Sequence, residues 1–371
     1  MLEVLREGAR IFSRNIDVRM HGLKRYKGDD EQICRKIIDG CYNKEKEFFM
    51  ASAGNYRSFY SRDFGWCIEG LLNLGYKAEV DNTLRYVMGI YAEKKDITVA
   101  INDKGKAFNF PNVYSPDSVA YLYRSLRISK SRKLIIKYSR FLNEQLITFE
   151  SEVLDKKGMV KDRRYSGMRD HVKTRSSCYD MIMACMLCDE VDRINKFMGK
   201  GYIMNVLKKY GLKKNLLKYY WNGRYFMDGL HDSYCSGHSN TYPYYLDVIS
   251  DKKMLKRSIR SIIEHGLDKP FPLTYGYSKN TKFIWQEIFV NGWEKDTSWA
   301  MLGLAYIDIL SRIDKTSARR HLKKYKDNIS RSKCFIEVYS DNDYYRSLFF
   351  ASDDSMLWAS MYLDLKKRLK P

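Results

Sequence analysis

Proline and glycine are scarce in this sequence, whose 371 residues include six prolines and 22 glycines. A β sandwich or barrel turns about every 8–12 residues and relies on these two residues for its turns. Their scarcity therefore argues against a many-turned β architecture. There is also no glycine-rich phosphate loop and no regular alternation of strand and helix patterns, so we do not expect a doubly wound nucleotide-binding sheet.

Long apolar runs are missing as well. No stretch approaches the roughly 18 apolar residues that a membrane span requires. The N-terminal segment MLEVLREGARIFSRN carries a charge every few residues and has no apolar core of signal-peptide length. We therefore expect a cytoplasmic protein with no membrane partner.

The sequence offers little for a metal or for a nucleophilic serine. Its six histidines are scattered, and the CxxC pair Cys185 and Cys188 has neither a second pair nor a nearby histidine. Most of the eight cysteines lie in apolar helical patterns, which is typical of buried thiols in a reducing compartment. No GxSxG motif occurs. We expect no metal and no cofactor.

Positive charge is in excess, because 66 lysines and arginines against 45 aspartates and glutamates give a net charge of +21. Such an excess first suggests a nucleic-acid partner. The basic residues are spread along the whole chain, however, and form no arm or stripe. We therefore do not expect nucleic acid as a partner, and an anionic saccharide stays an alternative substrate.

Apolar residues make up 44% of the chain and recur with a helical period through most of it. Many of these segments begin with good N-terminal signals; Ser115 and Pro116, for example, suit the N-cap and the first helical position. A hairpin is predicted at 218–230, where aromatic residues alternate around Asn222 and Gly223. The pattern predicts helices at about 30–50, 64–75, 76–95, 115–128, 130–154, 174–195, 200–216, 240–250, 252–266, 294–313, 315–331 and 352–367.

The predicted helices form pairs in which short turns alternate with long, aromatic and acidic loops. Twelve helices in six hairpins, with elaborate loops at one end, describe an all-α fold, the (α/α)6 toroid. We find no interdomain linker and expect one domain over 1–371, in which 1–29 forms an extension or a capping helix. The long loops are 51–63, 96–115, 155–173, 218–240, 267–293 and 332–352.

These loops place carboxylates beside aromatic rings and arginines, a combination that is typical of sugar sites. Sugar rings stack on tryptophan and tyrosine faces, and their hydroxyls bind carboxylates, arginine and asparagine. Hydrolysis of a glycoside then needs two carboxyl groups across one bond, one protonated to donate to the leaving oxygen and one ionised to activate water or attack. The pattern predicts an oligo- or polysaccharide substrate.

Asp63 and Asp170 are the first two candidates. Arg62 precedes Asp63 and should keep it ionised, which suits a hydroxyl clamp better than a proton donor; a helix N-cap is the structural alternative. The cations around Asp170 should lower its pKa unless aromatic burial opposes them, and a salt-bridged surface loop is its structural alternative. These cations are Arg169, His171, Lys173 and Arg175.

Glu337 is a single acid among apolar neighbours in CFIEVYSDNDYY. A carboxylate is costly there unless it faces a pocket or the solvent side of a strand. Glu287 and Glu294 lie close to tryptophans, including Trp293, so either substrate contact or a structural role is open to them; Glu294 also suits the first turn of the next helix. Three residues of the loop before Pro116 could contact hydroxyls or form a plain loop: Asn109, Asn112 and Tyr114.

At these positions the chain resembles the glycosidases with an (α/α)6 toroid: trehalases, the related processing α-glucosidases and glucoamylases. YSRDFGW (60–66) is similar to the Tyr-Trp-Asp-x-x-Trp segment of trehalases and the Arg-Asp of glucoamylases. INDKGKAFNFPNVYSPDS resembles an asparagine-rich loop of trehalases, and FVNGWEKDTSWAMLGLAYI resembles their tryptophan-containing loop and helix. The resemblance implies that these segments bind the sugar through Arg62, Asp63, Trp66 and their neighbours.

SGMRD and IEVYS resemble the segments that carry the general acid and the general base in that group, which implies these roles for Asp170 and Glu337. The resemblance covers about 55–365 and implies an inverting glycoside hydrolase acting on an α-glucoside or related sugar. The chain departs from the group at Tyr165, where the relatives have glutamate, at the extra Arg169, and in lacking a glycine-rich lid. Two alternative proton donors follow: Asp180 and Glu287.

Two other functions stay open on the sequence. One is a toroid hydrolase or lyase that acts on anionic, uronic saccharides, which the net charge of +21 motivates. The other is a non-catalytic carbohydrate-binding or basic scaffold protein, which would not need paired acids.

Overall fold

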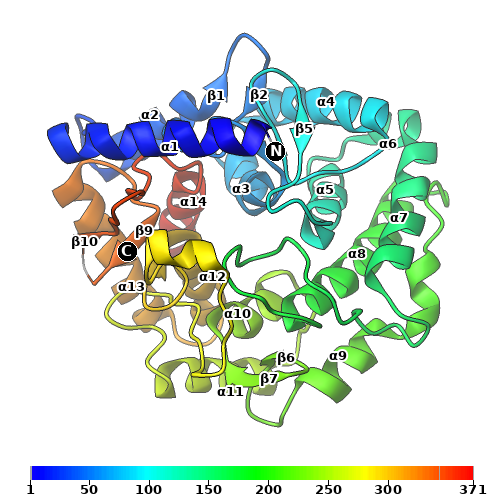
Figure 1. Ribbon diagram of the computed structural model, residues 1–371. Helices are drawn as coiled ribbons and strands as arrows, with labels where there is room; N and C mark the ends of the chain where they lie inside the picture. Colours follow the sequence, from blue (N-terminus) through cyan, green and yellow to red (C-terminus); the bar gives the residue numbers. More distant parts are fainter. Residues whose placement is uncertain (1, 342, 371) are drawn as a thin grey trace.

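The computed structural model describes residues 2–341 and 343–370. Six of its helices form a closed inner ring, because each contacts the next and the last contacts the first. Figure 1 shows them around the centre of the molecule. In chain order they are α3 (Ser61–Asn73), α5 (Pro116–Ile128), α8 (Cys178–Met198), α10 (Gly237–Tyr245), α12 (Ala300–Ser311) and α14 (Ala359–Leu369).

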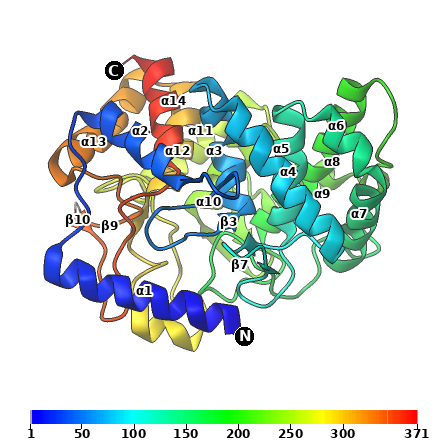
Figure 2. The same cartoon turned by 90° about the horizontal axis from the view of Figure 1, so that it is seen from above.

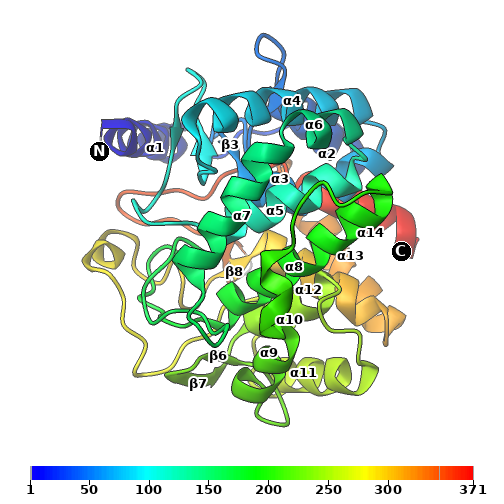
Figure 3. The ribbon, with the colours of Figure 1, turned by 90° about the vertical axis from the view of Figure 1, so that its right-hand side faces the viewer.

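An outer layer of helices surrounds this ring, and each inner helix contacts one outer partner. Figure 3 turns the molecule so that α7 and α9 of this layer face the viewer. This double ring of paired helices confirms the predicted all-α toroid. The outer partners are α4 (Lys77–Lys94), α7 (Ser139–Val153), α9 (Leu212–Tyr220), α11 (Lys252–Glu264), α13 (Lys315–Ser332) and α2 (Asp30–Cys41), and the short α6 (Arg132–Lys137) precedes α7.

The two layers differ in how much of each helix is apolar. Inner helix α12 is buried at every position from Ala300 to Leu310, as expected for a helix that has neighbours on all sides. Outer helix α11 instead buries one stripe that includes Leu255, Ile259 and Ile262, and its other positions are mainly lysine and arginine. The sequence therefore encodes which helices lie inside.

Short antiparallel sheets stiffen the loops that enter the inner helices. One sheet has the order β3 (Phe59–Tyr60), β4 (Ala100–Ile101) and β5 (Ala107–Phe108); β3 leads into α3, and β4 and β5 belong to the loop before α5. Another has the order β8 (Ser298–Trp299), β9 (Val338–Ser340) and β10 (Asp343–Tyr344); β8 leads into α12, and β9 and β10 belong to the loop before α14. The remaining pairs are β1 (Tyr42–Asn43) with β2 (Phe48–Phe49) and β6 (Met227–Gly229) with β7 (Asp232–Cys235).

The first helix, α1 (Leu2–His21), belongs to neither ring. It lies across the end of the toroid where the long loops gather (Figure 2). The C-terminus lies on the opposite side of the ring from α1 (Figure 3). The segment 1–29 thus contributes a helix to the loop-bearing end of the molecule.

Most predicted helices agree with the structure to within a few residues, and others do not. The helix expected at 30–50 ends at Cys41, because 42–49 form the β1–β2 hairpin. The helices expected at 294–313 and 352–367 begin only at Ala300 and Ala359, and the helix expected at 130–154 is divided at Tyr138 into α6 and α7. The helix expected at 200–216 is replaced by a 3-10 turn, Val206–Tyr210, and α9, separated by Gly211 in the left-handed conformation. The hairpin turn at Asn222 and Gly223 is confirmed by the bridge that pairs Trp221 with Phe226.

Within the described residues, no helix is long and apolar enough to cross a membrane. The same residues contain no group of three or more His, Cys, Asp or Glu side chains arranged to hold a metal ion. All eight cysteines are free thiols, and seven of them are buried.

Candidate active site

A cavity of about 300 Å³ opens at the end of the toroid where the long loops enter the inner helices. Two kinds of side chain dominate its wall. The aromatic ones include Tyr56, Tyr60, Trp66, Trp293, Trp299 and Trp358. The acids are Glu7, Asp63, Asp170, Glu294 and Glu337.

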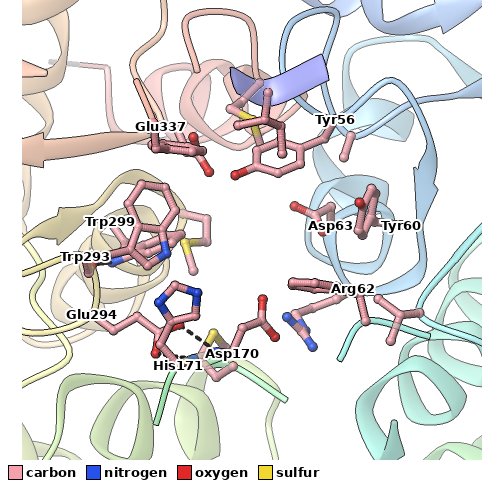
Figure 4. A pocket seen from close by; sticks show the side chains of 18 of the residues that line it. Tyr56, Tyr60, Arg62, Asp63, Asp170, His171, Trp293, Glu294, Trp299 and Glu337 are labelled. Carbon is pink, nitrogen blue, oxygen red and sulfur yellow. Dashed lines mark hydrogen bonds between the residues drawn. The ribbon is translucent and has the colours of Figure 1, made fainter. Parts of the chain in front are cut away.

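The wall is assembled from segments that are distant in sequence. Five of the six predicted long loops contribute to it, and the sixth, 218–240, packs behind the loop of Asp170. Figure 4 shows Asp170 and Glu337 pointing into the cavity from opposite sides, with Asp63 and Arg62 between them. The structure therefore brings six predicted site residues together around one space: Asp170, Glu337, Arg62, Asp63, Trp66 and Trp293.

Asp170 lies in the loop before α8, and burial raises the pKa of its carboxyl although Arg62 and His171 oppose the shift. Its Oδ1 atom is buried and has no hydrogen-bond partner. The pKa is raised despite the neighbouring cations because burial outweighs them, which is the exception that the sequence allowed. Two of these cations also turn away: the Arg169 guanidinium binds Asp228 at 2.7 Å, and that of Arg175 lies 3.7 Å from Asp162.

Glu337 directly precedes β9 and is almost fully buried. Burial, with the nearby carboxyl of Asp353, raises the pKa of Glu337 to about 8. Two groups hydrogen-bond to its carboxyl: the backbone N–H of Asp353, which donates to Oε2 at 2.9 Å, and the side chain of Tyr56. The acid among apolar neighbours thus faces a pocket, which is one of the two alternatives that its sequence context allowed.

Asp63 lies in the first turn of α3, where the partial positive charge of a helix N-terminus favours a carboxylate. The indole N–H of Trp358 donates to its Oδ1 at 2.9 Å. Burial nevertheless raises the pKa of Asp63 to about 6. Arg62 lowers this pKa, as expected, but burial outweighs it, and the Arg62 guanidinium forms its ion pair with Asp117, Nε to Oδ2 at 2.5 Å, rather than with Asp63.

Glu294 holds the loop of Asp170 in place. Its two carboxyl oxygens accept the backbone N–H groups of Asp170, at 2.6 Å, and of His171, at 2.9 Å. Burial raises the pKa of Glu294 to about 7. Glu294 is therefore not an acid of a helix's first turn, since α12 starts only at Ala300.

His171 also lines the cavity, and its Nδ1 lies 2.8 Å from Oε2 of Glu287. Burial by itself would lower the pKa of His171, but the hydrogen bond with Glu287 and the carboxylates of Glu294 and Asp170 raise it. Glu287 is buried behind this ring and does not line the cavity. Of the two roles that the sequence left open for Glu287, substrate contact would therefore be indirect, through His171.

Three further predicted contacts do not line the cavity. The side-chain oxygen of Asn109 accepts the backbone N–H of Val99 at 3.0 Å, Asn112 is exposed, and the ring of Tyr114 packs against the core. Their loop reaches the cavity through Phe108 and Phe110 instead. For these residues the plain-loop alternative describes the structure.

Asp180, the alternative proton donor, lies in the first turn of α8 outside the main cavity. Burial raises its pKa to about 7, while the Ser177 hydroxyl donates to its Oδ2 at 2.6 Å. It lines a separate space of about 30 Å³, on the scale of one or two water molecules. Such a space does not admit a sugar.

The sequence interpretation did not single out several lining residues. Tyr56, Trp299 and Trp358 were missed although each lies at or just before an inner helix or its entering strand. A search for tryptophan immediately ahead of each inner helix would have found Trp299 and Trp358, which directly precede α12 and α14, but not Tyr56, which lies ahead of β3. His171 was counted only as a cation beside Asp170, and nothing in its sequence indicates the pairing with Glu287.

Comparison with known proteins gives a fold and no sequence relative. The sequence matches no family model and no curated protein. A rhamnosidase from Klebsiella oxytoca with rhamnose bound has a TM-score of 0.65 and 12% identity, over 94% of this chain and 65% of that one. A glycosidase in complex with glucose has a TM-score of 0.67 and 11% identity, over 92% and 97%. The GH63 mannosylglycerate hydrolase from Thermus thermophilus has a TM-score of 0.60 and 10% identity, over 91% and 99%. The chain therefore has a toroid fold that glycosidases share.

Proposed function

We propose that this protein is an inverting glycoside hydrolase that cleaves a neutral α-linked glycoside, with Asp170 as general acid and Glu337 as general base. One observation carries the proposal: two carboxyl groups far apart in sequence, a half-buried one at Asp170 and a buried one at Glu337, point into the same aromatic cavity from opposite sides (Figure 4). Glycoside hydrolysis needs this pair. A protein that only bound sugar would have no use for two carboxyl groups with raised pKa values in one pocket.

The surroundings of Asp170 suit a proton donor. Asp170 lines the cavity, its buried Oδ1 has no hydrogen-bond donor to stabilise a negative charge, and burial favours the protonated form. Glu294 fixes the backbone on which Asp170 stands, so that the carboxyl would be presented in one orientation. The proton would pass from Asp170 to the leaving oxygen as the glycosidic bond breaks.

The surroundings of Glu337 suit a base that is held in position. The backbone N–H of Asp353 and the side chain of Tyr56 hydrogen-bond to its carboxyl, and both interactions favour the ionised form. Glu337 would take a proton from a water molecule on the face of the sugar opposite Asp170, and the resulting oxygen would attack the anomeric carbon. Asp63 and the aromatic side chains would hold the sugar between them.

The reversed assignment, with Glu337 as the donor, is favoured by one observation, its pKa of about 8. The residual activity of Asp170→Asn separates the two. If Glu337 is the base, residual kcat/KM rises as pH increases through about 8, because the ionised form is required. If Glu337 is the acid, residual kcat/KM falls over the same range.

The lining favours a neutral sugar over a uronic one. Five carboxyl groups face the cavity, against Arg62 and His171, and Arg62 is already paired with Asp117. Burial already disfavours negative charge in this cavity, since it raises the pKa values of Asp170, Glu294 and Glu337, and a uronate would add one more such charge. We further propose an α-glucoside or a related deoxy or mannosyl sugar, supported by the trehalase- and glucoamylase-like motifs and by the glucose, rhamnose and mannosylglycerate named for the fold's relatives.

The experiment is a panel of 4-nitrophenyl glycosides, namely α-glucoside, α-mannoside, α-rhamnoside and β-glucuronide, offered to the purified full-length protein. On the methyl glycoside of the sugar that the panel selects, whose leaving alkoxide needs a proton, Asp170→Asn and Glu337→Gln should each lower kcat by about 10²–10⁴-fold. Asp162→Asn is the matched control, an exposed acid in the loop of Asp170. Full activity in either of the first two variants would refute the assignment, and fastest cleavage of the glucuronide would refute the neutral substrate.

A further inference from the structure

We propose that α1 is part of the substrate pocket, and that Gly8 at its rim limits the size of the aglycone, the group that leaves with the glycosidic oxygen. This inference rests on the proposed function. The first observation is that three residues of α1 line the cavity together with the catalytic candidates: Glu7, Gly8 and Ile11.

Trp66 forms a floor of the cavity on the side away from α1. Trp66 lines this cavity and also a second, polar cavity of about 230 Å³, so that its indole stands between the two. The Trp66 indole N–H donates to the hydroxyl of Tyr121 at 2.7 Å, which fixes the floor. A sugar held by Asp63 near this floor would direct its aglycone toward α1 (Figures 2 and 4).

Specific contacts anchor α1 to the loop that supports Glu337. Arg14 forms an ion pair with Asp354 at 2.6 Å, and the buried Asn15 side chain donates to the carbonyl of Leu348 at 2.8 Å. Asp353, next to Asp354, donates the backbone hydrogen bond that positions Glu337. A helix held at these sites by buried polar groups is a fixed wall of the pocket.

Gly8 leaves space where any other residue would add bulk. A Cβ atom built at Gly8 meets no other atom within 4 Å, so larger side chains fit without strain and would occupy the mouth of the cavity. The neighbouring Ala9 is exposed and does not line the cavity. The cavity volume, about 300 Å³, is at the lower end of the range for ligand sites, which suits one sugar and a small aglycone.

The test compares two leaving groups in the full chain: the glycosyl fluoride and the 4-nitrophenyl glycoside of the sugar that the panel selects. The fluoride leaving group is a single atom, whereas a nitrophenyl group has to fit beside α1. Gly8→Trp should lower the ratio of kcat/KM for the nitrophenyl glycoside to that for the fluoride at least tenfold. Ala9→Trp should leave this ratio unchanged. Because the ratio is taken within one variant, loss of folded protein does not alter it.

Ile11→Ala should widen the cavity at the same wall and raise kcat/KM for a trisaccharide of that sugar relative to kcat/KM for the fluoride. The inference is overturned if Gly8→Trp leaves the ratio within twofold of the wild type, or if Ala9→Trp lowers it equally. Failure of the proposed function gives a different result, since the wild type would then cleave neither the fluoride nor any glycoside of the panel.

Discussion

Glu337→Gln should make the protein more stable while it removes activity. The folded-state pKa of Glu337, about 8, lies above the ordinary value of 4.5 because burial disfavours the charge. Between these two values the native state binds more protons than the unfolded state. Stability should therefore fall as pH rises from about 4.5 and level off above about 8. Glutamine is neutral at every pH and avoids this loss.

The size of the effect follows from the pKa difference. At pH 7 the unfolded carboxyl is ionised and the buried one is mostly protonated. The wild type therefore loses folding free energy over the interval from pH 4.5 to pH 7, about 2.5 pH units at 1.36 kcal/mol each, or about 3.4 kcal/mol. The glutamine amide oxygen can still accept the backbone N–H of Asp353. We expect a gain of about 3 kcal/mol at pH 7, which is about 4 °C in Tm for a chain of this length, and no gain near pH 4.

The assay is urea unfolding of the wild type and Glu337→Gln at pH 4, 5.5, 7 and 8.5. Glu190→Gln is the matched control, because Glu190 is equally buried but accepts hydrogen bonds from Arg127 at 2.9 Å and from Arg193 at 3.0 Å. That change should cost about 2 kcal/mol. A stability difference between Glu337→Gln and the wild type that does not grow between pH 4 and pH 8.5, or a destabilised variant at pH 7, would refute the reasoning.

Three further variants test other contacts of the site. Glu294→Gln replaces one of the two oxygens that accept backbone N–H groups of the Asp170 loop by an amide donor, so kcat should fall about 10²-fold. An unchanged kcat would contradict the role of Glu294 in holding this loop. Asp63→Ala should raise KM as well as lower kcat, measured by steady-state kinetics, because it removes a hydroxyl contact; a change in kcat alone would contradict that role. Asp228→Asn leaves the buried Arg169 without an ionised partner and should cost about 3 kcal/mol in urea unfolding, whereas a cost below about 1 kcal/mol would show that the pair is dispensable.

The fold could be predicted from the sequence because twelve segments of the chain carry the same helical pattern of apolar residues. Apolar periodicity, caps such as that of α5, and the alternation of short and long connections all point to the same ring. Boundaries failed where local chemistry interrupts a helical pattern. The segment after Cys41 has a helix-like composition, but Asn43 accepts the backbone N–H groups of Glu45 and Lys46 and thereby forms a turn.

The site was only partly predictable, because residues that are adjacent in the sequence are often not the ones that form ion pairs in the structure. Arg62 was expected to pair with Asp63 but pairs with Asp117, 55 residues away. Arg169 was expected to act on Asp170 but binds Asp228, 59 residues away. A pKa depends on burial and on such distant partners, and both arise only when the ring closes.

The direct test of the central claim is hydrolysis of a glycosyl fluoride by Asp170→Asn and Glu337→Gln. Fluoride leaves without a proton, so a lost general acid matters little, whereas a lost general base still leaves water unactivated. The account predicts that Asp170→Asn hydrolyses the fluoride at a rate within about tenfold of the wild type but no longer hydrolyses an alkyl glycoside of the same sugar. Glu337→Gln should hydrolyse neither substrate. Loss of fluoride hydrolysis in Asp170→Asn, with retention in Glu337→Gln, would contradict it.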